Sequence, residues 1–192
     1  MPFTFQATAL QDAQIITPKV FGDERGWFME TYQKDAFDQA DISTTWLQDN
    51  HSMSNKWVLR WLHFQIHSTQ GKLVRVMAGS VLDVIVDLRV GSSSYAQHIA
   101  VVLNATTKNQ LYVPRWFAHG FLTLEDATEF IYKCDNIYAP QHDGGIKYDD
   151  VDLHIDRKHY QELYEIEKLI ISEKDQHLPS FSHYKEHAHF TL

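Results

Sequence analysis

The stretch VLRWLHFQIH, Val58–His67, alternates apolar residues with other types, which is the pattern of a β-strand. Arg60, Trp61 and His63 lie close together inside this apolar run. An arginine, an indole and an imidazole are each costly or awkward to bury without a partner. The stretch is therefore either part of a functional site or a crowded piece of the core.

The same two-residue period recurs along most of the chain, between turns rich in Gly, Ser and Asp. The clearest predicted hairpin pairs Leu73–Met77 with Val81–Leu88 through a turn at Ala78–Ser80. Many short strands separated by turns favour an all-β sandwich or barrel over alternating β/α units. The other predicted strands are Ala13–Val20, Trp27–Tyr32, Trp46–Asn50, Trp57–Gln65, His98–Leu103, Gln110–Val113, Gly120–Leu124 and Glu129–Cys134.

Two segments have helical spacing instead. Lys34–Ala40 is short and polar, whereas Arg157–Ile171 predicts an amphipathic helix that packs on the β-domain. The residues on the face of that longer helix are Tyr160, Leu163, Tyr164, Glu167 and Ile170. The His-rich tail Phe181–Leu192 is compatible with disorder and with a partner contact. Because no repeat or linker interrupts the pattern, we expect one domain over residues 1–192.

Composition limits the classes of function. The chain has 192 residues, 44% hydrophobic and 22% charged, which is ordinary for a globular domain. A net charge of −8 argues against nucleic acid or an anionic membrane as partner, but leaves room for a small anionic ligand. A single cysteine, Cys134, fits a reducing compartment. The first residues lack a signal-peptide pattern and no apolar window is long enough to span a bilayer, so we expect a cytoplasmic protein.

A metal site is the first hypothesis for His63, His67 and His119. Metal-binding jelly rolls place two histidines one residue apart on a strand, followed by a carboxylate. Here Gln65 follows His63 at that spacing, and no acidic residue occurs in the next eight positions. We therefore expect no metal and no other cofactor.

Proton transfer is the second hypothesis. His63 supplies a base, Lys72 a cation for a developing oxyanion, Tyr132 an acid of high pKa, and Asp175 a carboxylate that orients an imidazole. Composition does not bring these four together, and a histidine or tyrosine on a strand is more often plain core or sheet. Arg25 and Arg60 are candidate anion clamps; a solvated turn residue is the simpler interpretation of Arg25.

Eight sequence blocks then follow one another in a familiar order. They are FGDERGWFMETY (Phe21–Tyr32), LQDNHSMS (Leu47–Ser54), VLRWLHFQ (Val58–Gln65), GKLVRV (Gly71–Val76), VLDVIVDLR (Val81–Arg89), FAHGFLTL (Phe117–Leu124), EFIYKCDNIYAP (Glu129–Pro140) and SEKD (Ser172–Asp175). Together they resemble the dTDP-4-dehydrorhamnose 3,5-epimerase family from about Ile15 to Asp175.

The resemblance implies an all-β, cupin-type jelly roll (a double-stranded β-helix) with a few short helices, mainly C-terminal. It also implies a metal-free homodimer whose N-terminal strands, within residues 1–50, reach the partner, and a C-terminal cover formed by residues 157–192. The implied substrate is dTDP-4-dehydro-6-deoxy-D-glucose. Its C4 ketone acidifies the hydrogens at C3 and C5, so both centres can be inverted through enolates.

By motif position, the resemblance makes His63 the base, oriented by Asp175, with Lys72 at the C4 oxygen and Tyr132 returning a proton from the opposite face. Tyr138 is then expected to stack on the thymine. The residues expected to hold the diphosphate are Arg25 and Arg60, helped by Gln48, Asn50 and His119. Those expected to contact substrate elsewhere are Glu30, Asp143 and Lys174, with Asp143 standing where the family has a longer Glu.

Trp61 is the main departure from the family pattern, which usually reads LRGLH at this point. In a regular strand Arg60 and His63 face opposite sides, so a shared site requires a bulge between them. Trp61 is then expected to line the sugar pocket or fill the gap beside His63, with a negative φ. Trp61 motivates one alternative, an epimerase acting at C3 or C5 only on a related nucleotide-4-ketosugar. A second alternative, different in kind, is a non-catalytic sugar-nucleotide-binding protein that keeps the jelly roll.

Overall fold

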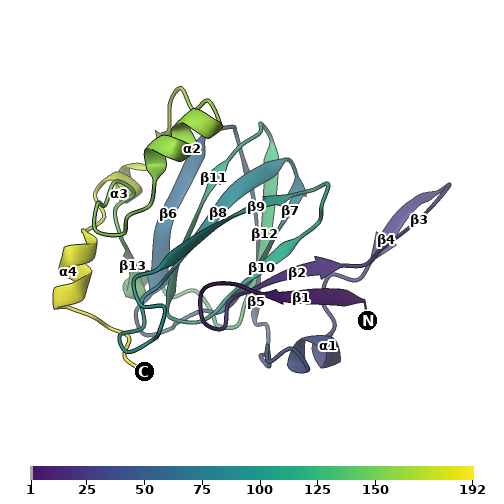
Figure 1. Ribbon diagram of the computed structural model, residues 1–192, viewed down its shortest axis with the longest axis horizontal. Helices are drawn as coiled ribbons and strands as arrows, with labels where there is room; N and C mark the ends of the chain where they lie inside the picture. Colours follow the sequence, from purple (N-terminus) through teal and green to yellow (C-terminus); the bar gives the residue numbers. More distant parts are fainter. Residues whose placement is uncertain (1) are drawn as a thin grey trace.

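Two curved, almost entirely antiparallel sheets face one another and form a jelly roll (Figure 1). The computed structural model describes residues 2–192. The first sheet has the order β1 (Phe3–Ala7), β2 (Gln14–Pro18), β10 (Gln110–Val113), β7 (Lys72–Ala78), β12 (Thr128–Cys134) and β5 (Gln48–Ser54). The second has the order β13 (Asp143–Gly145), β6 (Val58–Gln65), β11 (Phe117–Thr123), β8 (Ser80–Asp87) and β9 (His98–Asn104), with β14 (Ile170–Ile171) beside β6. The predicted fold class is confirmed.

The core has an inner layer between the sheets, an outer layer behind the second sheet, and a smaller cluster behind the first sheet. Strand β8 contributes to both: Val81 and Ile85 point inward, whereas Leu82 and Val84 point outward. Successive side chains of a strand point to opposite faces, and both faces of β8 are covered by core layers. All eight residues of β8 are therefore buried. The outer layer is closed by the C-terminal segment, which crosses behind β6 and β8 (Figure 1).

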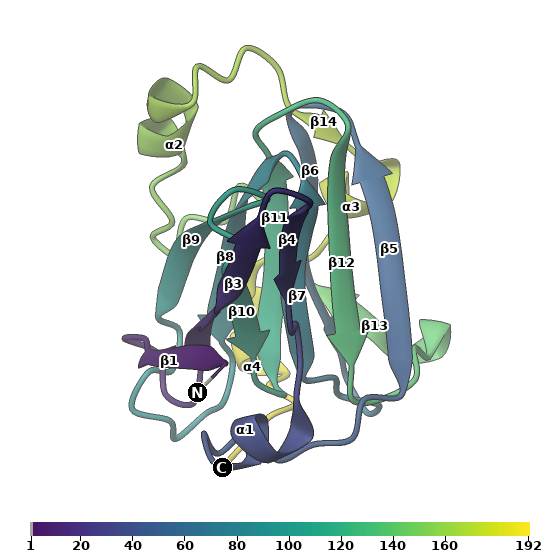
Figure 2. The ribbon, with the colours of Figure 1, turned by 90° about the vertical axis from the view of Figure 1, so that its right-hand side faces the viewer.

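The N-terminal part carries an arm that projects from the two sheets. Strands β3 (Val20–Asp23) and β4 (Gly26–Met29) form a separate two-stranded hairpin beyond β2 (Figures 1 and 2). Phe21 and Trp27 are 50% and 58% exposed there. After the arm, helix α1 (Lys34–Asp38) covers the outer face of the first sheet through Phe37, and confirms the short predicted helix.

The long helix predicted over Arg157–Ile171 is wrong in its second half. Helix α2 covers only Arg157–Leu163, and Glu165 has a positive φ of 50°. Ile170 and Ile171 instead pair in parallel with the edge of β6, which suits β-branched side chains. Tyr160 and Tyr164 pack on the outer core layer as expected, whereas Leu163 and Ile170 of the predicted face are exposed.

The chain after β14 is ordered, including the His-rich tail Phe181–Leu192. Helix α3 (Glu173–Gln176) comes first, and helix α4 (Phe181–Glu186) then places Phe181 and Tyr184 in the outer core layer. Phe190 is also buried in that layer. Of the two interpretations left open for the tail, disorder is therefore wrong. Among residues 2–192, no helix combines the length and apolar character that a membrane span requires.

The hairpin predicted at Leu73–Leu88 is also wrong. Strand β7 pairs with β10 and β12, whereas β8 pairs with β9 and β11, so the turn carries the chain from one sheet to the other. Gly79 makes this corner possible: its φ is +75°, and a β-carbon there would lie 2.4 Å from Thr128 Oγ1. The two-residue period of a strand specifies its buried face but not its partner strand. The sequence therefore predicted a hairpin between two strands that do not pair.

Strand β6 bulges where the site requires it. Against β11, His63 pairs with His119 and Arg60 pairs with Phe121. Between these two pairs β6 contains one residue more than β11, which is a β-bulge. Arg60 and His63 consequently face the same side. Gly120 permits the close approach, because a β-carbon there would lie 2.7 Å from the Arg60 carbonyl oxygen.

Candidate functional site

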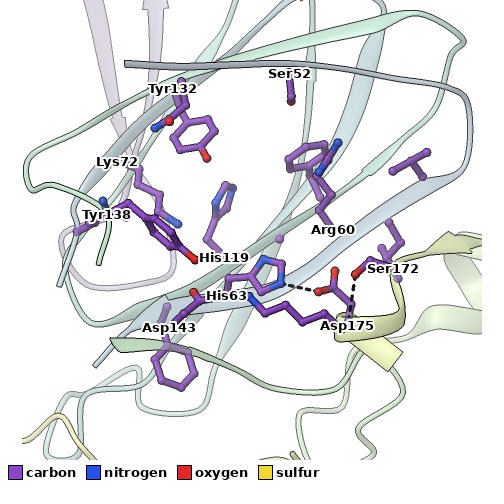
Figure 3. Close-up of a pocket in the computed structure, with 18 of the residues that line it drawn as sticks. Ser52, Arg60, His63, Lys72, His119, Tyr132, Tyr138, Asp143, Ser172 and Asp175 are labelled. Atoms are coloured by element: carbon purple, nitrogen blue, oxygen red, sulfur yellow. Dashed lines mark hydrogen bonds and ion pairs between the residues drawn. The ribbon is translucent and has the colours of Figure 1, made fainter. Parts of the chain in front are cut away.

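A cavity of about 690 Å³ opens between the two sheets, next to the bulge of β6. The strands that line it are β5, β6, β7, β11, β12, β13 and β14, and helix α3 closes one side. Charged and polar side chains from both sheets point into the same space (Figure 3). Six of these side chains come from the two sheets and helix α3 and carry groups able to move a proton or hold a charge: Arg60, His63, Lys72, His119, Tyr132 and Asp175.

His63 and Asp175 form the most direct contact in the cavity. His63 Nε2 lies 2.8 Å from Asp175 Oδ1, and the imidazole is 29% exposed whereas the carboxylate is 5% exposed (Figure 3). If Nε2–H donates to the carboxylate, Nδ1 is left as the basic nitrogen. A histidine with one face open to a cavity and a buried carboxylate behind it is the arrangement of a general base.

Asp175 is held in place by two backbone features. Its amide N–H donates to the Ser172 side chain, which is the N-cap of α3. Its Oδ2 accepts from the N–H of Trp61 at 3.3 Å, inside the bulge of β6. Burial acts to raise the pKa of the Asp175 carboxyl, but the bonds from His63, Trp61 and Ser172 outweigh it, and the pKa is lowered. The carboxylate is therefore ionised beside His63.

Lys72 enters the cavity from β7, in the opposite sheet (Figure 3). Burial lowers the pKa of its ammonium group, while the negative charges of Asp83 and Asp143 partly oppose this effect. Its Nζ lies 6.0 Å from the centre of the Tyr132 ring. A cation in such a poorly solvated position is well suited to stabilise an oxyanion.

Tyr132 faces the cavity from β12, the strand beside β7. Burial raises the pKa of its phenol, and the nearby Arg60 guanidinium partly opposes this. Its hydroxyl points toward the space that also receives His63 and Lys72 (Figure 3). The phenol is therefore protonated at neutral pH and able to donate a proton into the cavity.

His119 lies next to His63 in the sheet but is much less accessible. Its Nε2 is 2.9 Å from Asp83 Oδ2, and the imidazole is 6% exposed. Burial lowers the pKa of His119, with Asp83 opposing. Asp83 is not among the predicted site residues; the signal that could have found it is a carboxylate inside the otherwise apolar strand VLDVIVDL.

The rim of the cavity holds three more predicted residues. Tyr138 is 44% exposed at the mouth, and Asp143 and Lys174 form an ion pair across it. Asn50 also lines the wall, from β5. Ser172 is a further lining residue that the sequence analysis missed, although the Ser172-x-x-Asp175 spacing is a helix-start pattern.

Arg25, Glu30 and Gln48 are not among the residues that line this cavity. Arg25 lies at the tip of the arm, exposed and paired with Asp23, and Glu30 follows β4 at its base. Gln48 supports the wall indirectly, since it donates to Asn50 Oδ1 and accepts from the N–H of Tyr138.

Trp61 does not line the cavity or fill a gap beside His63, so that prediction is wrong. The indole is 5% exposed and packs in the outer core layer with Leu82 and Leu122, on the far side of the sheet. The bulge is the reason, because it turns Trp61 and Leu62 outward together. The predicted negative φ is confirmed, since Trp61 is absent from the residues of positive φ within 2–192.

The comparisons with known proteins agree on one family. Residues 7–183 match the family model described as dTDP-4-dehydrorhamnose 3,5-epimerase. The protein of that name from Methanothermobacter thermautotrophicus is 45% identical over 174 residues, which are 91% of this chain and 92% of that protein. The one from Salmonella typhimurium is 49% identical over 145 residues, covering 74% of this chain and 79% of that protein.

A solved structure agrees as well. The dTDP-6-deoxy-D-glucose-3,5-epimerase of Legionella pneumophila, in complex with dTDP-4-keto-L-rhamnose, superposes with a TM-score of 0.90 at 37% identity. The alignment covers 99% of this chain and 98% of that one. The similarity thus extends over both sheets, the arm and the C-terminal cover.

Proposed function

The chain belongs to the dTDP-4-dehydrorhamnose 3,5-epimerase family, and on that premise we propose that it inverts C3 and C5 of dTDP-4-dehydro-6-deoxy-D-glucose. The product is dTDP-4-dehydro-L-rhamnose. The observation that carries the proposal is the His63–Asp175 pair, which faces Lys72 and Tyr132 across one cavity. These groups supply everything that a proton abstraction beside a ketone requires.

His63 removes the proton at each centre. Its Nδ1 lone pair takes the hydrogen next to the C4 carbonyl, and the imidazolium that forms is stabilised by the ionised Asp175 at 2.8 Å. The Ser172 cap and the Trp61 amide hold that carboxylate at a fixed position, so the imidazole keeps one orientation. The sugar then carries an enolate whose charge lies mainly on the C4 oxygen.

Lys72 and Tyr132 complete the inversion. The Lys72 ammonium stabilises the enolate oxygen, and the cost of keeping it charged in the cavity is offset when that negative charge develops. Tyr132 donates its phenolic proton to the carbon from the face opposite His63, which inverts the centre. The phenolate and the imidazolium then return to their starting states by exchange with solvent.

The remaining contacts hold the nucleotide. The Arg60 guanidinium, exposed at the cavity mouth, pairs with the diphosphate, with Asn50 and His119 near it. Tyr138 stacks on the thymine, and the Asp143–Lys174 pair contacts the substrate where the family has a longer Glu. These roles are extended to this chain through its family membership and agree with the positions of the side chains. We place the enzyme in the cytoplasm, with no cofactor.

Arg25 and Glu30 belong to this site only if a second copy of the chain provides them. We propose a homodimer in which the β3–β4 arm of each single-domain protomer reaches the partner's cavity. In support, the arm projects from the sheets and exposes Phe21 and Trp27, apolar surface of the kind that a protein interface covers (Figure 1). In the dimer, Arg25 of the arm pairs with the diphosphate.

A mixing experiment tests the arm exchange. His63→Ala and Arg25→Ala are each expected to lower activity, the first by the loss of the base and the second by weaker binding. Co-refolded heterodimers regain one complete site, with His63 from one chain and Arg25 from the other, so activity rises above that of either variant alone. If the mixture only averages the two variants, each arm serves its own protomer or none.

The two alternatives have less support. An epimerase acting at one centre was motivated by Trp61, and the indole is turned away from the cavity. A non-catalytic binding protein gives no chemical reason to keep His63, Lys72, Tyr132 and Asp175 around one space. Neither is favoured by a specific observation.

Deuterium exchange tests the reaction. After incubation with dTDP-4-dehydro-6-deoxy-D-glucose in D2O, we expect NMR to locate deuterium at both C3 and C5. Label at one carbon supports a single-centre epimerase, and no label contradicts the proposal. Tyr132→Phe adds a sharper test: His63 can still exchange protons on its own face, so label enters without inversion.

A further inference from the structure

The histidine-rich C-terminal segment takes no part in the reaction described above. Within residues 2–192, its helix α4 and the C-cap of that helix hold the one group of three or more His, Cys, Asp or Glu side chains whose ligand atoms all lie within 4.8 Å of one another. The group consists of His183, Glu186 and His187, all exposed. Residues three and four apart lie on the same face of a helix, so the backbone itself brings these groups together.

Packing fixes the direction of that face. Phe181 and Tyr184 anchor α4 in the outer core layer, and the Tyr184 hydroxyl donates to the Leu88 carbonyl oxygen at 2.9 Å. The Ser180 side chain caps the first turn by accepting from the N–H of His183. With its inner face held by these contacts, α4 presents the His–Glu–His face to solvent without rotating.

The two imidazoles are already arranged as ligands. Their ring centres are 4.5 Å apart, and the planes differ by 33°. His187 Nδ1 lies 3.0 Å from the His183 carbonyl oxygen, so Nδ1–H donates to it and Nε2 is free to bind. Metal-ligating histidines typically have such a partner for the second ring nitrogen, because it fixes the tautomer and the ring orientation. The neighbouring Lys185 is occupied by Asp152 and does not compete for Glu186.

We propose that His183, Glu186 and His187 bind one divalent transition-metal ion of the Zn²⁺ class. Two imidazoles and a carboxylate suit Zn²⁺, with water in the fourth position. The expected preference over Mg²⁺ follows from the nitrogen ligands. The ion ties the first turn of α4 to its C-cap and so stabilises a segment whose Tyr184 ring packs against Phe64, the residue after His63.

This site is a binding site and not a hydrolytic centre. The spacing H-x-x-E-H also occurs in a class of zinc peptidases, where the glutamate serves as general base. Here all three side chains are exposed on the surface of α4, and none of them lines the cavity between the sheets. Helix α4 also lies at the opposite end of the molecule from the β3–β4 arm (Figure 1), and its three candidate ligands are outside the cavity that the partner's arm is proposed to reach.

Isothermal titration of the full chain with ZnCl₂ tests the proposal. We expect one ion per chain for the wild type. In His183→Ala and His187→Ala we expect the affinity for Zn²⁺ to be at least about tenfold weaker, because even the loss of a residue that only hydrogen-bonds a metal ligand weakens metal affinity by that factor. The matched control is His177→Ala. His177 caps α3 with the same kind of bond, Nδ1 to the Glu173 carbonyl oxygen at 2.7 Å, but has no second histidine beside it.

A second readout does not depend on titration. Zn²⁺ is expected to raise the melting temperature of the wild type and of His177→Ala, because a ligand that binds only the folded state stabilises it. That rise disappears in His187→Ala, whose melting temperature without metal stays close to the wild-type value because the side chain is exposed and its one hydrogen bond lies at the end of the helix. Equal affinities in all variants, binding of Mg²⁺ as tightly as Zn²⁺, or no binding at all would overturn the proposal.

Discussion

Two histidines that are neighbours in the same sheet each pair with a carboxylate, and the two pairs differ mainly in access. His63–Asp175 and His119–Asp83 have nearly equal separations, 2.8 Å and 2.9 Å. The first imidazole is 29% exposed toward the cavity, whereas the second is 6% exposed. Burial lowers the pKa of His119. The same pair of residue types is therefore expected to act as a base at His63, whereas at His119 it forms a buried, neutral part of the cavity wall.

The origin of the carboxylates adds to this difference. Asp83 is part of β8, the strand next to His119, and is fully buried. Asp175 comes from the C-terminal segment, where the cap of α3 and the bulge of β6 aim it at His63. The catalytic pair is therefore assembled from parts distant in sequence. The inner pair is built into two adjacent strands.

His63→Ala is the change with the largest expected effect on the comparison. General acid–base catalysis contributes typically about 10²–10⁴-fold, and we expect deuterium exchange to fall by that factor. Binding of dTDP, measured by titration, stays close to wild type because the base does not hold the nucleotide. The control is His67→Ala, an exposed histidine whose ring lies 4.9 Å from His142. Exchange at the wild-type rate in His63→Ala would show that the base lies elsewhere.

Lys72→Met is expected to lower kcat by about 10²–10³-fold, the usual effect of removing an oxyanion donor. Its pH dependence is the sharper measurement. Since burial lowers the pKa of Lys72, its charge is lost as pH rises through a value below the ordinary lysine pKa of about 10.4. The alkaline limb of kcat/KM should lie there and move upward in Lys72→Arg. An unmoved limb would assign it to another group.

The two carboxylates are expected to respond differently to the same substitution. Asp175→Asn removes the charge that stabilises the imidazolium, so kcat falls by about 10²-fold with little change in KM. Asp83→Asn instead weakens a buried bond and lowers the free energy of unfolding by about 1–3 kcal/mol. Its kcat falls less than tenfold by comparison. Denaturant unfolding and steady-state kinetics on both variants check this, and equal losses of kcat would remove the distinction between the pairs.

Asp83→Asn is also expected to change the pKa of Lys72. The Asp83 charge raises the pKa of Lys72 against the effect of burial. Its loss should therefore move the alkaline limb to lower pH, opposite to the shift expected for Lys72→Arg.

The sequence predicts the fold class and most strand positions, because period-two alternation is local. It does not predict which strands pair: β7 and β8 read as a hairpin although Gly79 directs them into different sheets. The helix prediction for the segment after Arg157 is wrong for a related reason. Its helical spacing is overridden beyond Leu163, where Ile170 and Ile171 find an open strand edge.

The candidate site, too, is only partly predictable from the sequence. The residues inside the cavity are carried by motifs of the family, and the structure brings His63, Lys72, Tyr132 and Asp175 into one space. Parity along a strand correctly required a bulge between Arg60 and His63. It could not indicate which residues the bulge would turn outward, because that depends on the register against β11.

Trp61→Gly is the change with the smallest expected effect on the reaction. Because the indole fills the outer core layer, its removal leaves a cavity and lowers the free energy of unfolding by about 3–5 kcal/mol, as for other large-to-small core changes. The Trp61 N–H that bonds Asp175 belongs to the backbone and persists in the glycine variant. We therefore expect the ratio of deuterium at C3 and C5 to remain that of the wild type, measured below the lowered melting temperature. A changed ratio would mean that the outer layer, through the bulge, sets which carbon His63 reaches.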